Sequence, residues 1–101
     1  MWNLVFFDLP VVNPADQKQS VKFRDNLLKD GFRMFQFSIY MRHSISRDGA
    51  DLHKRRVRGF LPKKGKVGIL QITDKQFGMM EIFEGRSEVE VSPPPQQLEF
   101  F

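Results

Sequence analysis

The stretch NLVFFDLP, residues Asn3 to Pro10, runs four consecutive apolar residues into a carboxylate, Asp8, with a proline two residues later. An apolar run of this kind is typical of a β-strand that is buried on both faces. We expect the strand to cover residues 2–9, because Pro10 has no amide hydrogen to donate to a neighbouring strand. A charge at the end of a buried strand is costly unless another group pairs with it, so Asp8 is a candidate functional residue.

The residues that follow predict a helix over residues 14–30. Asn13 is a good N-cap, Pro14 suits the first helical position, and Gly31 is the residue expected just after the helix end. On a helical wheel, four apolar side chains share a broad face that we expect to face the core: Val21, Phe23, Leu27 and Leu28. Three basic side chains fall together on the opposite side: Lys18, Lys22 and Lys29.

The rest of the chain alternates strand and helix signals. Apolar and polar residues alternate over residues 32–42, which predicts a half-buried strand that bends or breaks near Gln36. A second helix, capped by Ser46 or Asp48, should end at about residue 60. Further strands are expected over three ranges: a buried strand at 67–73, a short strand around 80–83 that follows a turn, and a solvated edge strand at 88–91.

This order of elements predicts an α+β fold of the ferredoxin-like type, βαββαβ, with an additional C-terminal strand. With 101 residues the chain is one small domain, and its size leaves self-association open. We expect a core over residues 1–85, followed by the edge strand and a proline-rich tail over 86–101. The fold alone decides no function, because the same architecture carries many activities.

Composition narrows the class of protein. There is no cysteine, which rules out a disulfide framework and a thiolate metal site. No apolar run approaches the length of a membrane span, and no basic segment precedes the first strand, so we expect a cytoplasmic protein without a membrane partner. The net charge is +4, with basic residues dominant over 18–66 and acidic residues over 81–101. A basic body of this kind favours a polyanionic partner.

Asp8 has two interpretations. It could cap a turn or pair with a nearby lysine or arginine, or it could be a catalytic and metal-binding carboxylate. Magnesium or manganese often takes only one or two protein carboxylates, and water and substrate phosphates complete its coordination. In a two-fold homodimer, a second Asp8 would be supplied if the two strand ends faced each other.

The basic residues are candidates for phosphate contacts. Such contacts need lysine and arginine without strict spacing, and they carry no base specificity. The alternative is an ordinary solvated helix face, although the sequence HKRRVR over residues 53–58 is denser than such a face needs. The candidate nucleic-acid-binding residues are Lys18, Lys22, Lys29, Arg33, Arg42, Lys54, Arg55 and Arg58.

Other polar and aromatic residues carry weaker signals. His53 falls towards the apolar side of the second helix and is expected to be a packed residue, and His43 is expected to lie in a loop. Beyond the polyproline segment, exposed aromatic residues suit a groove on a partner protein. The candidate partner-binding residues are Leu98, Phe100 and Phe101.

Three motifs together resemble a known family. LVFFDLP, GFRMFQFSIYMR and ILQITDKQF resemble, in order and spacing, the small CRISPR-associated protein of spacer acquisition, above all members from type II systems. The resemblance covers residues 1–85. It implies a ferredoxin-like homodimer whose extra C-terminal strand docks on the partner subunit or sheet, with Asp8 bound to Mg²⁺ or Mn²⁺ and facing its symmetry mate. It further implies that the dimer sits between integrase subunits and holds double-stranded DNA while the integrase transfers strands.

The resemblance is incomplete at one position. Many relatives carry an arginine where this chain has Met34, with Arg33 one residue earlier, and adjacent strand residues point to opposite faces. This departure weakens a nuclease function more than a scaffold function. We therefore favour a DNA-binding dimeric adaptor in CRISPR adaptation. The alternatives are a magnesium-dependent endonuclease on RNA or DNA, centred on paired Asp8, and an unrelated ferredoxin-like module that binds only protein.

Overall fold

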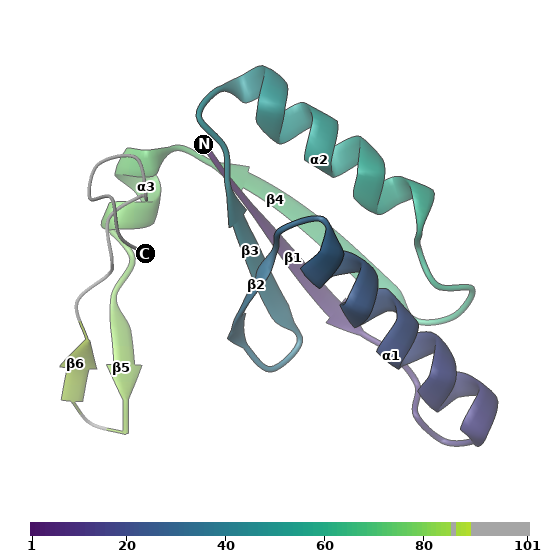
Figure 1. The fold of residues 1–101 in the computed structure, drawn as a ribbon. Helices are drawn as coiled ribbons and strands as arrows, with labels where there is room; N and C mark the ends of the chain where they lie inside the picture. Colours follow the sequence, from purple (N-terminus) through teal and green to yellow (C-terminus); the bar gives the residue numbers. More distant parts are fainter. Residues whose placement is uncertain (86, 90–101) are drawn as a thin grey trace.

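Four antiparallel strands form one sheet in the order β2-β3-β1-β4, and two long helices connect them (Figure 1). The computed structural model describes residues 1–85 and 87–89 of the chain. The elements are β1 (Trp2–Asp8), α1 (Pro14–Lys29), β2 (Arg33–Gln36), β3 (Ile39–His43), α2 (Arg47–Gly59), β4 (Lys66–Ile72), α3 (Asp74–Gly78), β5 (Ile82–Glu84) and β6 (Ser87–Val89). The α+β class and the ferredoxin-like order of the first six elements are confirmed.

The ends of the two long helices follow the local chemistry of the sequence. The side chain of Asn13 accepts a hydrogen bond from the Asp16 amide at 2.9 Å, which caps α1 as predicted. For α2 the cap is Ser46, whose hydroxyl oxygen accepts from the Gly49 amide at 3.2 Å. Gly31 follows α1 with φ +91°, a backbone conformation that L side chains rarely adopt.

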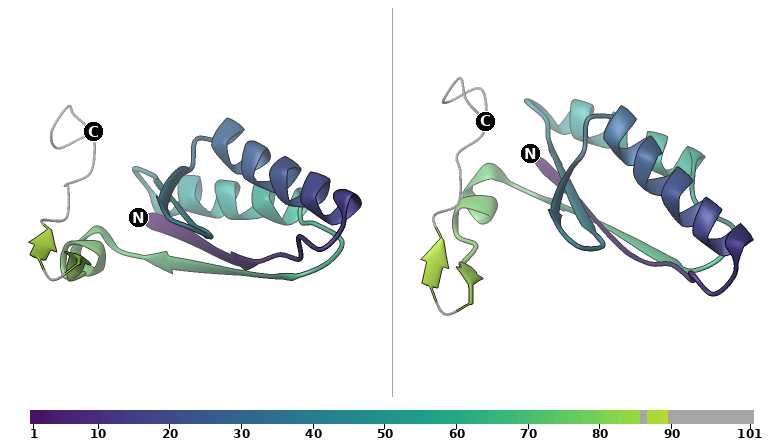
Figure 2. Two further views of the ribbon diagram at one scale, coloured as in Figure 1. Left: turned by 90° about the horizontal axis from the view of Figure 1, so that it is seen from below. Right: turned by 60° about the horizontal axis from the view of Figure 1, so that its bottom comes forward.

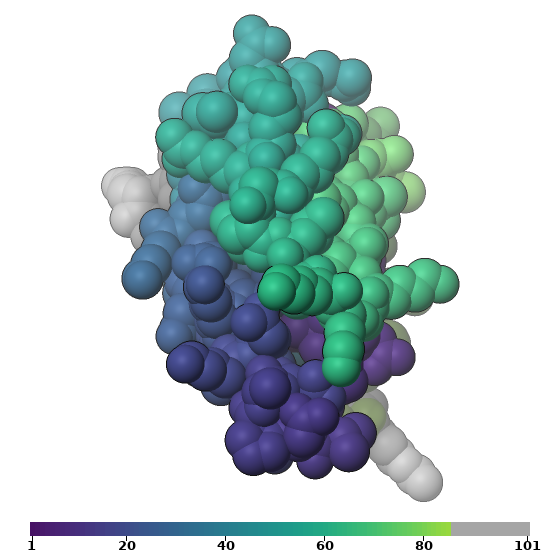
Figure 3. All heavy atoms as spheres, turned by 90° about the vertical axis from the view of Figure 1, so that its right-hand side faces the viewer, coloured from purple at the N-terminus to yellow at the C-terminus, as the bar shows by residue number. Residues whose placement is uncertain are grey.

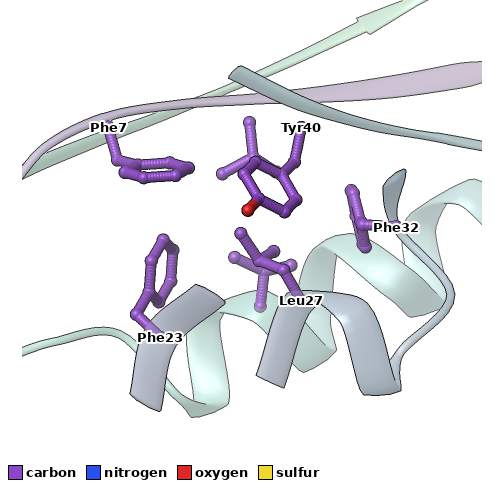
Figure 4. Packing of buried hydrophobic residues seen from close by; sticks show 7 residues of the cluster. Phe7, Phe23, Leu27, Phe32 and Tyr40 are labelled. Atoms are coloured by element: carbon purple, nitrogen blue, oxygen red, sulfur yellow. The ribbon is translucent and has the colours of Figure 1, made fainter. Parts of the chain in front are cut away.

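Both long helices cover the same face of the sheet, which leaves a two-layer molecule (Figure 2). The main core lies between these layers and is built of large apolar side chains from the sheet and from both helices (Figure 4). Its buried members are Val5, Phe7, Phe23, Leu27, Phe32, Tyr40 and Val57. Phe7 meets Phe23 edge to face, with ring centroids 5.2 Å apart.

Two of the four apolar residues expected to face the core from α1 do not do so. Phe23 and Leu27 are buried, but Val21 is 48% exposed and Leu28 is 51% exposed. The buried stripe of α1 instead includes Ser20. The helix therefore buries a narrower face than the broad apolar arc predicted from its sequence, and the prediction was wrong for Val21 and Leu28.

The segment after β4 also differs from the prediction. We expected a turn there, but residues 74–78 form the short helix α3, whose cap Thr73 exchanges side-chain and backbone hydrogen bonds with Gln76 at 2.9 and 3.0 Å. Phe77 of α3 stacks on Trp2, with ring centroids 3.9 Å apart, and joins a second cluster with Leu4. This short helix therefore covers one end of the sheet face that α1 and α2 leave open.

The C-terminal strands form a sheet of their own. β5 pairs with β6 in a two-stranded antiparallel hairpin, which lies beyond the end of the main sheet in Figure 1. The expected edge strand at 88–91 corresponds in part to β6, and the partner-binding candidates Leu98, Phe100 and Phe101 lie outside the described residues. Within the described part of the chain, no helix is both long enough and apolar enough to cross a lipid bilayer.

Candidate functional site

The alternation of β1 decides where Asp8 points. Val5 and Phe7 pack into the core beneath the helices, so Phe6 and Asp8 lie on the opposite face of the sheet. Asp8 is exposed there, and the side chain of Phe6 is 37% exposed. The sheet face opposite α1 and α2 is covered by α3 at one end only. We call the part that α3 does not cover the open face. It contains Phe6, Asp8, Ile39, Lys66, Gly68 and Leu70.

A shallow hollow of about 400 Å³ lies on the open face at the end of β1, lined by residues that include Phe6, Asp8, Ser38, Lys66 and Gly68. Gly68 is the cross-strand partner of Phe6, and a Cβ added to it would meet no atom within 4 Å. The absence of a side chain at this position therefore leaves room beside the Phe6 ring and next to the Asp8 carboxylate.

Lys66 lies directly across the ladder from Asp8. The register of β1 and β4 pairs the two residues, and both are exposed and line the same hollow. Directly opposed residues on one face of an antiparallel pair have Cβ atoms about 5 Å apart, which is within reach of a lysine ammonium and a carboxylate. Lys66 lies just before the strand predicted over residues 67–73, and nothing local in the sequence gives this register.

The backbone at Asp8 is held from two sides. On one side, the Phe7 amide donates to the Ser38 carbonyl at 3.0 Å, and Ser38 has φ 65°, an uncommon value for a residue other than glycine. On the other side, Gly65 (φ +92°) lies so close that an added Cβ would be 2.7 Å from the Asp8 carbonyl oxygen. These contacts fix the direction in which the Asp8 side chain leaves the sheet.

The donor set around Asp8 does not fit a metal ion within one chain. In the part of the chain that the structure describes, no group of three His, Cys, Asp or Glu side chains lies close enough to hold one. The nearest charged neighbour across the ladder is instead a cation, Lys66. Magnesium or manganese at this position would need carboxylates from a second copy, and the cofactor stays a prediction.

The structure does not bring Arg33 to Asp8. Arg33 lies on the same sheet face, but its cross-strand neighbour is Met41, which in turn pairs with Leu4, four residues before Asp8. Strand geometry puts the two Cα atoms roughly 16 Å apart. Met34 pairs with Tyr40 on the helix side and is 53% exposed, so neither residue supplies a cation to the Asp8 hollow.

The basic side chains of the helices gather on the other side of the molecule. The three predicted lysines of α1, Lys18, Lys22 and Lys29, are all exposed. On α2, Arg55 and Arg58 are exposed and Lys54 is half-buried. Figure 3 looks at the molecule from the right-hand side of Figure 1, where the surfaces of α1 and α2 lie next to each other and long side chains project from the segment that leads into β4. We call this surface the helix layer.

Not every basic residue of the helix layer is available to a ligand. Asp30, at the end of α1, accepts from His53 Nδ1 at 2.8 Å and from Arg56 Nη1 at 3.1 Å, which ties α2 to α1. His53 is buried, as predicted. Arg42 is half-buried and its guanidinium packs over Gly31 at the end of α1.

A second polar cluster, formed by His43, Asp74 and the amino group of Met1, was not predicted from the sequence. His43 is the last residue of β3 rather than a loop residue, and its Nε2 donates to Asp74 Oδ1 at 3.0 Å, because an ionised carboxylate can only accept. The amino group of Met1 donates to the same oxygen at 2.8 Å. Burial lowers the pKa of His43, and Asp74 only partly opposes it. Burial alone would raise the pKa of Asp74, but its hydrogen bond from the amino group and its interactions with His43 lower it.

The structure is that of a small ferredoxin-like α+β protein whose two long helices cover one face of an antiparallel sheet. Its two surfaces differ chemically: the helix layer is basic, and the opposite face has an exposed carboxylate at the end of β1. Comparison with known proteins agrees with this class. The family described as CRISPR associated protein Cas2 matches residues 1–80.

Curated proteins named CRISPR-associated endoribonuclease Cas2 are similar along the whole chain. The protein from Flavobacterium psychrophilum is 55% identical over 101 residues, which cover all of this chain and 88% of that protein. The protein from Parvibaculum lavamentivorans is 40% identical over 101 residues and matches end to end, and that from Paracidovorax avenae is 44% identical over 101 residues and 94% of its length. The chain belongs to the CRISPR-associated Cas2 family, as the three sequence motifs predicted.

Proposed function

We propose that this protein acts in CRISPR adaptation as a dimeric adaptor that holds duplex DNA and bridges integrase subunits. The observation that carries the proposal is the separation of two surfaces: the basic helix layer lies on one side of the sheet, and the open face lies on the other. A dimer formed through the open face would leave both helix layers outward and accessible to DNA.

The charge of the helix layer suits a phosphate backbone. The α1 segment contains four lysine and arginine residues against two aspartates, and the α2 segment contains five against two. Phosphate binding of this kind gives affinity and position without base specificity, and it weakens steeply with salt because counterions are released. An adaptor that accepts DNA of any sequence needs this property.

The open face suits a second copy of the chain. Leu70 is 48% exposed on it and Phe6 is 37% exposed, so two large apolar side chains meet water on this face. A two-fold axis through this face would set the same apolar strip of each copy against the other, as an isologous interface requires. It would also bring the two Asp8 carboxylates towards each other.

Duplex binding across a salt series tests the adaptor. We expect the wild-type protein to bind with an affinity that falls steeply with salt, Asp8→Asn to bind equally well, and charge reversal of Arg55 and Arg58 to abolish binding. Lys75→Glu is the control for a charge reversal outside the helix layer, because Lys75 is exposed but lies on α3. Binding that survives reversal of Arg55 and Arg58 contradicts the proposal.

A second candidate function is metal-dependent cleavage of nucleic acid. The names of the relatives favour it, since each is called an endoribonuclease. Paired Asp8 carboxylates of a dimer would be the residues to hold Mg²⁺ or Mn²⁺, which would supply Lewis-acid chemistry at a phosphodiester. Cleavage of RNA or DNA that needs the metal and disappears in Asp8→Asn would support it, and cleavage that persists in that variant would exclude Asp8 as its centre.

A further inference from the structure

We propose that Lys66 is the counter-ion of the Asp8 pair, so that this dimer closes over its carboxylates without a divalent metal. The inference rests on the dimer of the proposed function and goes beyond it, because it assigns a role to a residue on the rim of that interface. The observation behind it is the mismatch between Asp8 and a metal site. Among the described residues no group of three His, Cys, Asp or Glu side chains could hold a metal ion, and a lysine lies directly across the ladder from Asp8.

The first step is electrostatic. Two carboxylates brought together across a two-fold axis repel each other, and burying them without a partner charge is costly. Each copy of the chain brings one Asp8 and, on the neighbouring strand and the same face, one Lys66. The closed site of a dimer therefore holds two negative and two positive charges, and its net charge is zero.

The second step is spatial. The side chain of Asp8 makes no hydrogen bond or ion pair with any residue that the structure describes, so its oxygens can accept from an ammonium. Gly68 leaves the hollow beside Asp8 empty of a side chain, and Lys66 lines the same hollow. The flexible lysine stem can reach either its own Asp8 or that of the second copy, because its methylene groups tolerate an apolar surface while the ammonium stays on a polar partner.

The third step concerns the metal. A divalent cation that enters a site already neutralised by two ammonium groups gains little from the carboxylates and is repelled by the lysines. Without Lys66 the same site would carry a charge of −2, and a divalent cation would then stabilise the dimer. Lys66 thus sets whether dimer closure depends on metal.

The test is the dimer dissociation constant, measured by sedimentation with EDTA and with excess magnesium chloride. We expect the wild-type constant to be the same in both. For Lys66→Met, which keeps the length of the side chain and removes its charge, we expect the constant in EDTA to rise by about 10- to 100-fold and to return towards the wild-type value with magnesium. Lys64→Met is the matched control, because Lys64 pairs with Asp16 at 3.5 Å on the helix side.

The double variant Asp8→Asn/Lys66→Met separates charge from packing. We expect it to dimerise in EDTA like the wild type, because the repulsion between carboxylates is gone. Three outcomes would each overturn the role of Lys66. They are a Lys66→Met dimer that is as stable in EDTA as the wild type, a wild-type dimer that dissociates in EDTA, and a double variant that dimerises as weakly as Lys66→Met. A wild-type protein that is monomeric at every concentration would instead refute the proposed dimer itself.

Discussion

Replacing Gly65 with alanine tests the contact that holds the backbone at Asp8, and Gly31 provides a matched control. The two glycines have nearly the same backbone conformation, with φ +92° and +91°. Alanine in this left-handed region costs about 1–2 kcal/mol at either position. Any difference between the two variants therefore reports what the added methyl group meets.

The surroundings of the two glycines differ in how far they can yield. At Gly65 the new Cβ would lie 2.7 Å from the Asp8 carbonyl oxygen and 2.7 Å from Leu9 Cδ2, and the first of these is backbone in the last pair of a ladder. At Gly31 it would meet the guanidinium of Arg42, the far end of a flexible side chain. Overpacking against fixed atoms costs about 1–3 kcal/mol more, whereas Arg42 can swing aside.

We therefore expect the free energy of unfolding to fall by about 1–2 kcal/mol in Gly31→Ala and by about 2–5 kcal/mol in Gly65→Ala. Urea unfolding followed by circular dichroism, at one fixed protein concentration, measures both losses. Equal losses in the two variants would show that the close approach of Gly65 to Asp8 does not matter, and the idea of a held Asp8 would fail.

Three further outcomes follow from the packing. Phe77→Ala should cost about 3–5 kcal/mol of unfolding free energy, because the ring is 3% exposed in the second cluster; a loss below 1 kcal/mol would mean that α3 is not docked. Asp30→Asn should cost about 1.5–3 kcal/mol, since its charged hydrogen bonds join the helices, while Asp25→Asn on the exposed side of α1 should change little. Stability should fall as the pH drops below about 6.5, where His43 takes up a proton more readily unfolded than folded, and fall again below about 3.8 as Asp74 is protonated. Asp74→Asn should abolish the second loss in a urea series across pH.

The sequence predicted the parts of the fold that local chemistry determines. Asn13 and Pro14 mark the start of α1, and Ser46 was one of two candidates for the start of α2. The break in the long alternating segment near Gln36 corresponds to the turn between β2 and β3. Caps, prolines and alternation act over a few residues, so a single sequence is enough to find them.

What the sequence could not give depends on contacts between distant segments. Val21 and Leu28 are apolar yet exposed, because the width of the buried stripe on α1 is set by how the helix sits on the sheet. The pairing of Asp8 with Lys66 depends on the register between β1 and β4, and a shift of one residue would put the lysine on the other face. Asp8 itself was predicted as a site residue, but its neighbours were not.

The charges at the end of β1 also bear on which molecule can cover the open face. An exposed apolar face can bind any apolar surface, so a protein with such a face is prone to non-specific association. Asp8 and Lys66 cost little while water covers them, but burying them under a purely apolar partner would leave both desolvated. A second copy related by a two-fold axis brings its own Asp8 and Lys66 in matching positions. Each charge of one copy therefore has an opposite charge available on the other. The Asp8 and Lys66 pair would then select the correct partner and register for the interface, and the apolar strip beside it would supply most of the affinity.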